Sequence, residues 1–199
     1  MQGIVIAVAL GLGLAAAAGF RVFVPLLAVG VAAKVGYLHL ADSFNWIGST
    51  PAVIALGVAT VLEVAAYYVP WLDHALDVVA TPAAVIAGMI TSASVLTDMP
   101  PAVRWLVPII GGGGIAGLVQ GASVLTRMKS TALTGGLANP VISTAELAGA
   151  VCTVIIALFF PVLALLLCLT LCFLIFRASG RVLLGDGLPP DHPFTRDMP

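Results

Sequence analysis

Several charged and amide side chains lie inside the apolar segments of this sequence, and they are its best candidates for chemistry. The first is an arginine near the centre of AAAAGFRVFVPLLAVGVAAK, residues 15–34. The full set is Arg21, Glu63, Gln120, Arg127, Lys129, Asn139 and Glu146. Charges in apolar surroundings usually face the interior of a helical bundle, where they pair or mark the route of an ion or substrate. This set could therefore form ion pairs or bind an anion.

Two interpretations of the set are open. In the first, Arg21 and Arg127 hold an anion, and Glu63 or Glu146 exchanges protons near neutrality. In the second, the charges form structural ion pairs that fix the helices, while Arg127 and Lys129 extend to the lipid headgroups. The first predicts a binding site between helices, and the second predicts a paired, rigid bundle.

The segment PWLDHALDVVATP holds a second group of polar residues. Asp73 and Asp77 are one helical turn apart, with His74 beside the first, so both carboxylates could lie on one face and hold a cation. The segment offers no further ligand, which makes this a weak metal site. A polar connection with acidic residues near a helix start is the favoured interpretation.

Enzyme signatures are missing from the sequence. It has no Gly-x-Ser-x-Gly elbow, no His-Glu-x-x-His pair and no Walker loop. We therefore predict neither an enzyme nor a cofactor. The formal net charge of −1 also gives no reason to expect a nucleic-acid partner.

Composition decides the environment of the chain. Of its 199 residues, 61% are hydrophobic and 9% are charged, and the mean hydropathy is +1.16. Soluble domains carry about 25% charged residues. In lipid only helices and closed barrels satisfy the backbone. The sequence thus predicts an all-α, polytopic transmembrane bundle with the lipid bilayer as its partner.

We predict about five spans in a transmembrane domain of residues 1–177, followed by a short polar cytoplasmic tail at 178–199. The start, MQGIVIAVAL, is read as part of the first span because it lacks the basic region of a signal peptide. The spans are 3–33, 51–70, 82–96 with a start as early as residue 77, 103–136, and 140–176. Three of them start with a proline after a Thr or Asn, which is typical of a helix N-terminus.

The first and fourth spans look too long for one crossing. As straight helices they would measure about 46 and 51 Å, against a hydrocarbon core of about 30 Å. Residues 19–25 and 126–136 are the expected breaks. Transporters place discontinuous helices at their substrate sites; a proline kink and an ordinary loop are the alternatives.

Basic residues predict the orientation. With the N-terminus outside, Lys34, Arg104, Arg177 and Arg181 fall on the cytoplasmic side, as the positive-inside rule requires. Arg127 and Lys129 are then the exceptions, and the C-terminus is cytoplasmic.

Glycines suggest two further features. The segments from Gly11 and from Gly114 both combine a small-residue helix with an arginine, and both precede a span that has a proline start and one glutamate. Three spans separate them, which would make them an inverted repeat. Small-residue stripes also let helices approach closely, within the chain or in a homo-oligomer. The stripe residues are Gly11, Gly19, Gly113, Gly117 and Gly121.

Three segments carry a resemblance to a known family: GLGLAAAAGFRVFVPLLAVGVAAKVGYL, WIGSTPAVIALGVATVLEVAAYYVPWLDHALDVVATP and GGLANPVISTAE. The chain resembles the small bacterial integral-membrane proteins catalogued as domain of unknown function 4126. The resemblance implies a multi-pass protein of the bacterial cytoplasmic membrane and leaves the activity open.

The leading hypothesis is a small transporter or channel-like permease whose polar site holds a small anion or an anionic lipid headgroup. Arg21, Glu63, Arg127 and Glu146 would form that site between broken helices. A structural or assembly protein is the second hypothesis. An intramembrane lipid-modifying enzyme that uses Asp73, His74 and Asp77 is the third.

Overall fold

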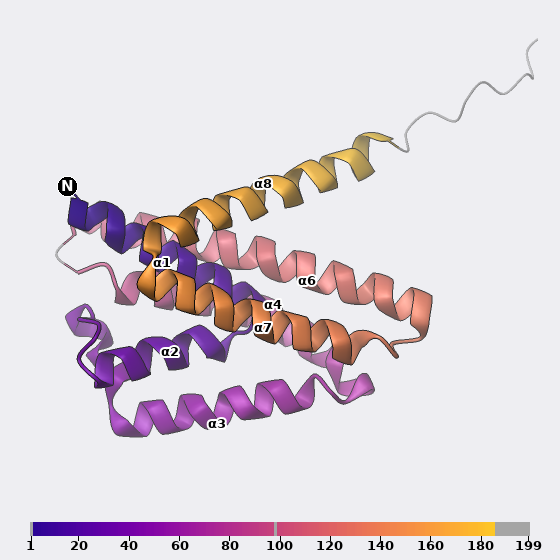
Figure 1. Cartoon of the computed structure of the whole chain (residues 1–199), viewed down its shortest axis with the longest axis horizontal. Helices are drawn as coiled ribbons and strands as arrows, with labels where there is room; N and C mark the ends of the chain where they lie inside the picture. Colours follow the sequence, from indigo (N-terminus) through magenta and orange to yellow (C-terminus); the bar gives the residue numbers. More distant parts are fainter. Residues whose placement is uncertain (1, 98, 186–199) are drawn as a thin grey trace, which may run out of the picture.

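The computed structural model describes residues 2–97 and 99–185, without the side chains of residues 2, 70–75 and 178–185. Within this part of the chain the fold is all-helical, as predicted, and contains no strand (Figure 1). Its elements are α1 (Gln2–Phe20), α2 (Phe23–Lys34), the 3-10 helix η1 (Asp42–Gly48), α3 (Thr50–Ala66), α4 (Pro70–Ser94), α5 (Pro101–Leu106), the π-helix η2 (Val107–Gly112), α6 (Gly113–Thr134), α7 (Asn139–Phe159) and α8 (Pro161–Gly185).

Several of these helices are long and apolar enough to cross a membrane. Four described segments qualify alone, and η1 with α3, bent by 65°, makes a fifth. The four are Gly3–Phe20, Leu76–Ser94, Pro101–Thr134 and Asn139–Phe159. Trp46 and Trp105 are both largely exposed near one end of the bundle, as tryptophans at a membrane boundary are. The chain is therefore a multi-pass membrane protein.

The first predicted span is a helical hairpin. The expected break falls at Arg21, where α1 ends, and α2 then runs back beside it (Figure 1). Gly13 in α1 and Tyr37 after α2 both lie beside residues 157–158 of α7. Phe20, which lies between these two in the sequence, is instead beside Gly149, further from that end of α7. The chain thus returns to the end from which it started.

This reversal changes the predicted topology. Lys34 and Arg104 lie at the same end of the bundle as the N-terminus. Arg177, far along α8, lies toward the opposite end of the bundle (Figure 1). The grouping of these three residues on one side was therefore wrong. We call the two ends of the bundle the N-terminal end and the Gly135 end, after the turn between α6 and α7.

The inverted repeat is also wrong in the form predicted. Leu12 in α1 lies beside Gly111 just before α6, and Gly19 lies beside Val119 within α6. The two helices therefore run in the same direction, whereas an inverted repeat needs opposite directions. The extra reversal at Arg21 is the physical reason.

Other predicted boundaries need correction as well. Pro82 does not start a helix: it lies inside α4, which begins at Pro70. A membrane helix tolerates an internal proline when its neighbours support the freed backbone groups. The predicted fifth span is two helices, because Phe160 and Pro161 end α7 and start α8. The predicted polar tail continues α8 from residue 178 to Gly185, and residues 186–199 lie outside the described part of the chain.

The fourth span is interrupted in another place than predicted. The helix continues through residues 126–134, and Gly135, with φ +64°, ends it in a left-handed conformation. The irregular segment is η2, the π-helix before α6. Its wider turn brings Gly112 so close to α4 that an added Cβ would lie 2.7 Å from the carbonyl oxygen of Gly88.

The glycine stripes pack mainly within the chain. An added Cβ on Gly11, Gly19, Gly113 or Gly117 would lie 3.2 Å or less from a neighbouring helix, whereas Gly121 has no described atom within 4 Å. These stripes therefore hold α1, α4 and α6 together, and they do not form the free surface on which the predicted homo-oligomer relied. The oligomer itself stays a prediction.

A methyl group at Gly88 should loosen the contacts of α4 with α6 and η2. Its Cβ would lie 2.5 Å from that of Ala116, so we expect Gly88→Ala to cost about 1–3 kcal/mol through overpacking. Gly121→Ala is the matched control and should stabilise α6 by about 0.5–1 kcal/mol. Thermal unfolding in lipid nanodiscs measures both. A midpoint for Gly88→Ala at or above that of Gly121→Ala would contradict the packing described.

Candidate functional site

The tip of the α1–α2 hairpin is held by a carboxylate from another helix. The first amide groups of α2 have no partner within that helix, and its own N-cap residue provides none. Glu63, near the end of α3, accepts hydrogen bonds from the backbone N–H groups of Val22 at 2.8 Å and Phe23 at 3.1 Å. Glu63 therefore caps α2 from outside and ties the tip to α3.

Arg21 lies at this tip and is 1% exposed. Its Nη2 donates a hydrogen bond to the carbonyl oxygen of Ser143 at 2.8 Å and also contacts the hydroxyl of that residue. The same nitrogen is 3.6 Å from Oε2 of Glu146. Within the described part of the chain, Nε and Nη1 of Arg21 have no hydrogen-bond partner. Charged donors are thus buried without a full set of acceptors.

Arg127, in α6, is much more completely paired. Its Nε donates to Oε1 of Glu146 at 3.2 Å, and its Nη2 binds Oε2 of the same carboxylate. Its Nη1 donates to Asp77 at 2.8 Å. The contact with Glu146 is the bidentate arrangement that makes guanidinium–carboxylate pairs strong. Arg127 therefore joins α6 to α7 and α4.

A tyrosine joins the two arginines. The guanidinium carbon atoms of Arg21 and Arg127 lie 4.1 and 4.0 Å from the ring centre of Tyr67. Tyr67 follows α3 directly, is 3% exposed, and places its hydroxyl 3.4 Å from Asp77. A cation over an aromatic face gains about 2 kcal/mol when both are desolvated. The ring lets two like charges lie close together.

These side chains form one unit, which we call the arginine cluster. Its members are Arg21, Glu63, Tyr67, Asp77, Arg127 and Glu146. It lies between the hairpin tip and the Gly135 end, where the bundle has α3, α4, α6 and α7 but neither α1 nor α2 (Figure 1). Three carboxylates face two guanidiniums, so the cluster is formally neutral after one proton is bound.

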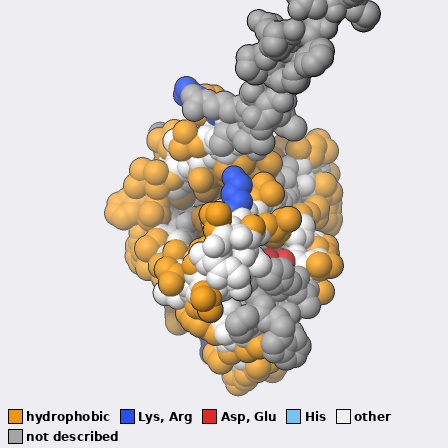
Figure 2. Space-filling model, turned by 90° about the vertical axis from the view of Figure 1, so that its right-hand side faces the viewer, with side chains coloured by type: hydrophobic (Ala, Val, Ile, Leu, Met, Phe, Trp, Pro, Cys, Tyr) orange, Lys and Arg blue, Asp and Glu red, His pale blue; other side chains and the backbone are white. Residues whose placement is uncertain are grey.

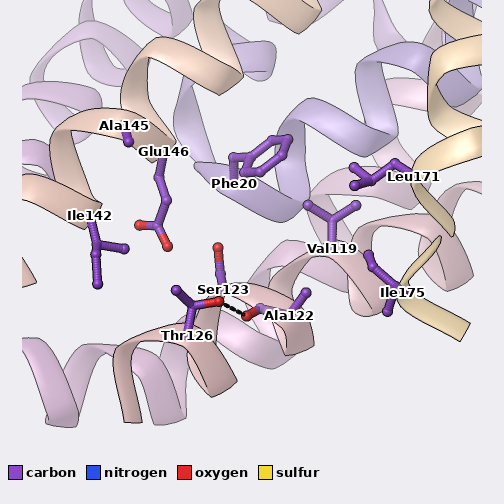
Figure 3. A pocket seen from close by; sticks show the side chains of 10 residues that line it. All are labelled: Phe20, Val119, Ala122, Ser123, Thr126, Ile142, Ala145, Glu146, Leu171 and Ile175. Carbon is purple, nitrogen blue, oxygen red and sulfur yellow. Dashed lines mark hydrogen bonds between the residues drawn. The ribbon is translucent and has the colours of Figure 1, made fainter. Parts of the chain in front are cut away.

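Two pockets reach the cluster from different sides. The first, which we call the α8 pocket, measures about 350 Å³ and lies between α1, α6, α7 and α8. In Figure 3 the carboxylate of Glu146 points into it, toward Ser123 and Thr126, while Phe20 lies on the opposite side. The second, the α3–α4 pocket, measures about 420 Å³ and is lined by apolar residues together with Glu63 and Tyr67.

The cluster also comes close to the surface of the Gly135 end. The side chain of Asp77 is 13% exposed, against 3% for Arg127. Figure 2 views this end, where acidic atoms reach the surface in one place. The carboxylates therefore separate the guanidiniums from the outside.

Four of the seven predicted site residues meet in the cluster, and three do not. Gln120 is buried in α6 away from it, and its Nε2 has no partner within the described residues. Asn139 starts α7 and donates to the hydroxyl of Thr131 at 3.1 Å, so it belongs to the turn between α6 and α7. Lys129 is exposed on α6.

One residue of the predicted weak metal site, Asp77, takes part in an ion pair. Asp77 is bound by Arg127 and by the hydroxyl of Tyr67, which compete with any cation. The side chains of Asp73 and His74 lie outside the described part of the chain, so the prediction for these two stays as it was.

Sequence reasoning missed Tyr67 and Ser143, and it placed Asp77 in the wrong group. One signal was present: Tyr67 follows Glu63 by four residues, which puts both on the same face of a helix. For Ser143 the equivalent signal is Glu146, three residues later. Partners of a buried charge can thus be sought one helical turn from its counter-ion.

The sequence matches a known family over nearly its whole length. Residues 8–181 match the family described as "Domain of unknown function (DUF4126)". No curated protein and no solved structure shows significant similarity to the chain. The match agrees with the resemblance inferred from the hairpin, Pro70–Pro82 and Asn139–Glu146 segments.

Removing the cap on α2 should destabilise the hairpin. Glu63→Ala leaves the buried amide of Val22 and the partly buried amide of Phe23 without acceptors, and we expect a loss of about 2–4 kcal/mol in unfolding free energy. Glu63→Gln keeps one acceptor and should lose less. Thermal unfolding in nanodiscs measures the order. Equal midpoints for Glu63→Ala and wild type would show that the tip does not depend on this carboxylate.

The ring of Tyr67 should matter more than its hydroxyl. Tyr67→Leu removes both cation–π contacts and should lower stability by about 2–4 kcal/mol, whereas Tyr67→Phe should lose about 1 kcal/mol with the long hydrogen bond to Asp77. Tyr68→Leu, at an exposed neighbouring position, is the control: it removes only a hydrogen bond with the hydroxyl of Thr144 and should lose about 1 kcal/mol or less. Chemical or thermal unfolding gives the ranking, and a Phe variant as weak as the Leu variant would contradict it.

Proposed function

We propose that this chain, which belongs to the family described as Domain of unknown function (DUF4126), is a small permease that carries an anion across the membrane through the arginine cluster. One observation carries the proposal: Nε and Nη1 of Arg21 are buried without hydrogen-bond partners in the described protein. An unsatisfied charged donor costs more than about 1–3 kcal/mol. Arginine stays protonated in proteins, so the acceptor that suits it best is an anion.

Glu146 marks the place where an anion could enter the arginine cluster. Its carboxylate is shared by Arg127, through two hydrogen bonds, and by Arg21, at 3.6 Å. An anion that binds Arg21 would replace Glu146 beside this guanidinium, and a proton taken up with the anion would offset the added negative charge. One proton and one monovalent anion leave the net charge of the cluster unchanged. Symport with this ratio therefore avoids a large electrostatic penalty in the bilayer.

The hairpin supports a transport role through its geometry. Its tip joins two helix ends part-way along the bundle, and transporters use such discontinuous helices to line their sites. The α8 pocket reaches Glu146 and the α3–α4 pocket reaches Glu63 and Tyr67, so the cluster has access from two sides. Movement of the tip between these sides would alternate the access.

We place the protein in the bacterial cytoplasmic membrane with its N-terminus outside. Lys34 and Arg104 lie at the N-terminal end, while Lys129, Arg177 and Arg181 lie toward or beyond the Gly135 end. The positive-inside rule then puts the Gly135 end and the C-terminus in the cytoplasm. This is the orientation predicted from the sequence; Arg177 and Arg181 support it as before, while Lys129 takes the place of Lys34 and Arg104.

A structural or assembly role is the second candidate, and the complete pairing of Arg127 favours it. Asp77 and Glu146 connect Arg127 to two other helices, which is the geometry of a charge that fixes helix register. Such a role would leave no function for the free nitrogen atoms of Arg21.

Transport by purified protein in proteoliposomes separates the two roles. With chloride, nitrate, acetate and phosphate as probes, we expect uptake by wild type to rise when the outside is acidified. Arg21→Gln should lose at least about tenfold in rate, equivalent to one charged hydrogen bond. Lys129→Gln should match wild type. Uptake equal to that of empty liposomes for all four probes would remove the support for the permease.

A further inference from the structure

We infer that the N-terminal end of the bundle binds a zwitterionic phosphoethanolamine headgroup, with its phosphate at Arg104 and Lys34 and its ammonium at Asp42. This site lies at the opposite end of the bundle from the arginine cluster, so the inference is independent of the permease (Figure 1). Two adjoining pockets that carry both signs of charge support it.

These two pockets lie between the end of α2, the segment that leads into η1, and the connection from α4 to α5. They measure about 660 and 440 Å³, within the range of about 300–1,000 Å³ that is usual for small-molecule sites. Both are lined by His39, Leu40 and Asp42, so we treat them as one site and call it the headgroup site. Lys34 lines the larger pocket and Arg104 the smaller one. Half or more of the lining residues of each are polar, unlike those of the pockets beside the arginine cluster.

The charged side chains of the headgroup site are not paired with one another. Lys34 donates one hydrogen bond to the hydroxyl of Thr50, and a nitrogen atom of Arg104 approaches the hydroxyl of Ser43 at 3.5 Å. Both of these partners are neutral. Within the described part of the chain, no ion pair involves Lys34, Arg104 or Asp42. Two cations and a carboxylate therefore line one site without their counter-charges.

The position of the headgroup site is that of the lipid headgroups. Trp46, next to Asn45 of the larger pocket, and Trp105, next to Arg104 of the smaller one, are both largely exposed. Tryptophans concentrate where a membrane meets water. The candidate span Pro101–Thr134 also begins here, which puts Arg104 in the first turn of an apolar segment. A ligand at this level is therefore the headgroup of a neighbouring lipid or a soluble molecule of the same chemistry.

Charge complementarity selects a head that carries both signs. A phosphate diester suits the guanidinium of Arg104 and the ammonium of Lys34, because both groups donate hydrogen bonds and accept none. A purely anionic head would leave Asp42 unpaired beside it, whereas a primary ammonium supplies the donors that this carboxylate accepts. A trimethylammonium group has no N–H to donate. The headgroup site should therefore prefer phosphoethanolamine over both phosphoglycerol and phosphocholine.

Native mass spectrometry of the full-length protein in detergent micelles tests this inference. The probes are dioleoyl phosphatidylethanolamine, phosphatidylglycerol and phosphatidylcholine, each added at the same concentration. We expect wild type to retain phosphatidylethanolamine about threefold more than either of the others, the size of effect that partly exposed ion pairs give.

Three variants separate the two charges of the head. Asp42→Asn should lower the retention of phosphatidylethanolamine to that of phosphatidylcholine and leave phosphatidylglycerol as strongly bound as before. Arg104→Gln should lower the retention of phosphatidylethanolamine and phosphatidylglycerol alike, by about threefold. Lys129→Gln removes an exposed cation outside the headgroup site and should bind all three lipids as wild type does. A thermal midpoint like that of wild type confirms that each variant is folded.

The outcomes are decisive for the headgroup site alone. Equal retention of the three lipids by wild type, or a preference for phosphatidylethanolamine that Asp42→Asn leaves intact, would overturn the inference. Soluble phosphoethanolamine added as a competitor separates the two sources of the head: displacement of the lipid assigns a water-soluble zwitterion, and retention of the lipid assigns a membrane lipid. Anion uptake is not part of this measurement, so its failure would overturn the permease and leave the headgroup site standing.

Discussion

The desolvated guanidinium of Arg21 sets the requirements for the rest of the bundle. A permanent charge at the end of α1, removed from water, needs acceptors and counter-charge from several directions. Ser143 and Glu146 supply them from α7, and Tyr67 supplies an aromatic face after α3. The helices that surround the hairpin tip are therefore arranged around one cation, while Ala18 and Val22 on either side of it pack against apolar residues of α4 and α6.

The hairpin tip also satisfies the electrostatics of two helix ends. The C-terminus of α1 carries partial negative charge and the N-terminus of α2 carries partial positive charge. Arg21 lies at the first and Glu63 binds the second. Each charged side chain thus compensates the helix end that it meets, which explains how the chain can reverse among apolar helices.

The sequence predicts the cluster better than it predicts the path of the chain. Arg21, Glu63, Arg127 and Glu146 stand out because a charge in an apolar stretch is visible without knowledge of the fold. The reversal at Arg21 is not visible, since hydropathy is the same for a helix that crosses and for one that turns back. Pro82 was wrongly predicted to start a helix for a related reason. Thr81-Pro82 is a local signal for a helix start, but the continuous helix α4, which lipid favours, includes it. The role of Tyr67 depends on two cations from distant helices, which no local pattern contains.

The hairpin has a consequence for how the protein is made. Glu63 and Ser143 lie 41 and 122 residues beyond the atoms that they bind at the tip. When the ribosome has completed α1 and α2, the amides of the tip and the cation beside them therefore still lack their protein partners. The tip must stay hydrated, or remain with the insertion machinery, until α3 caps it and α7 arrives. Biogenesis of this small protein thus ends with the burial of a charge that was among the first to be synthesised.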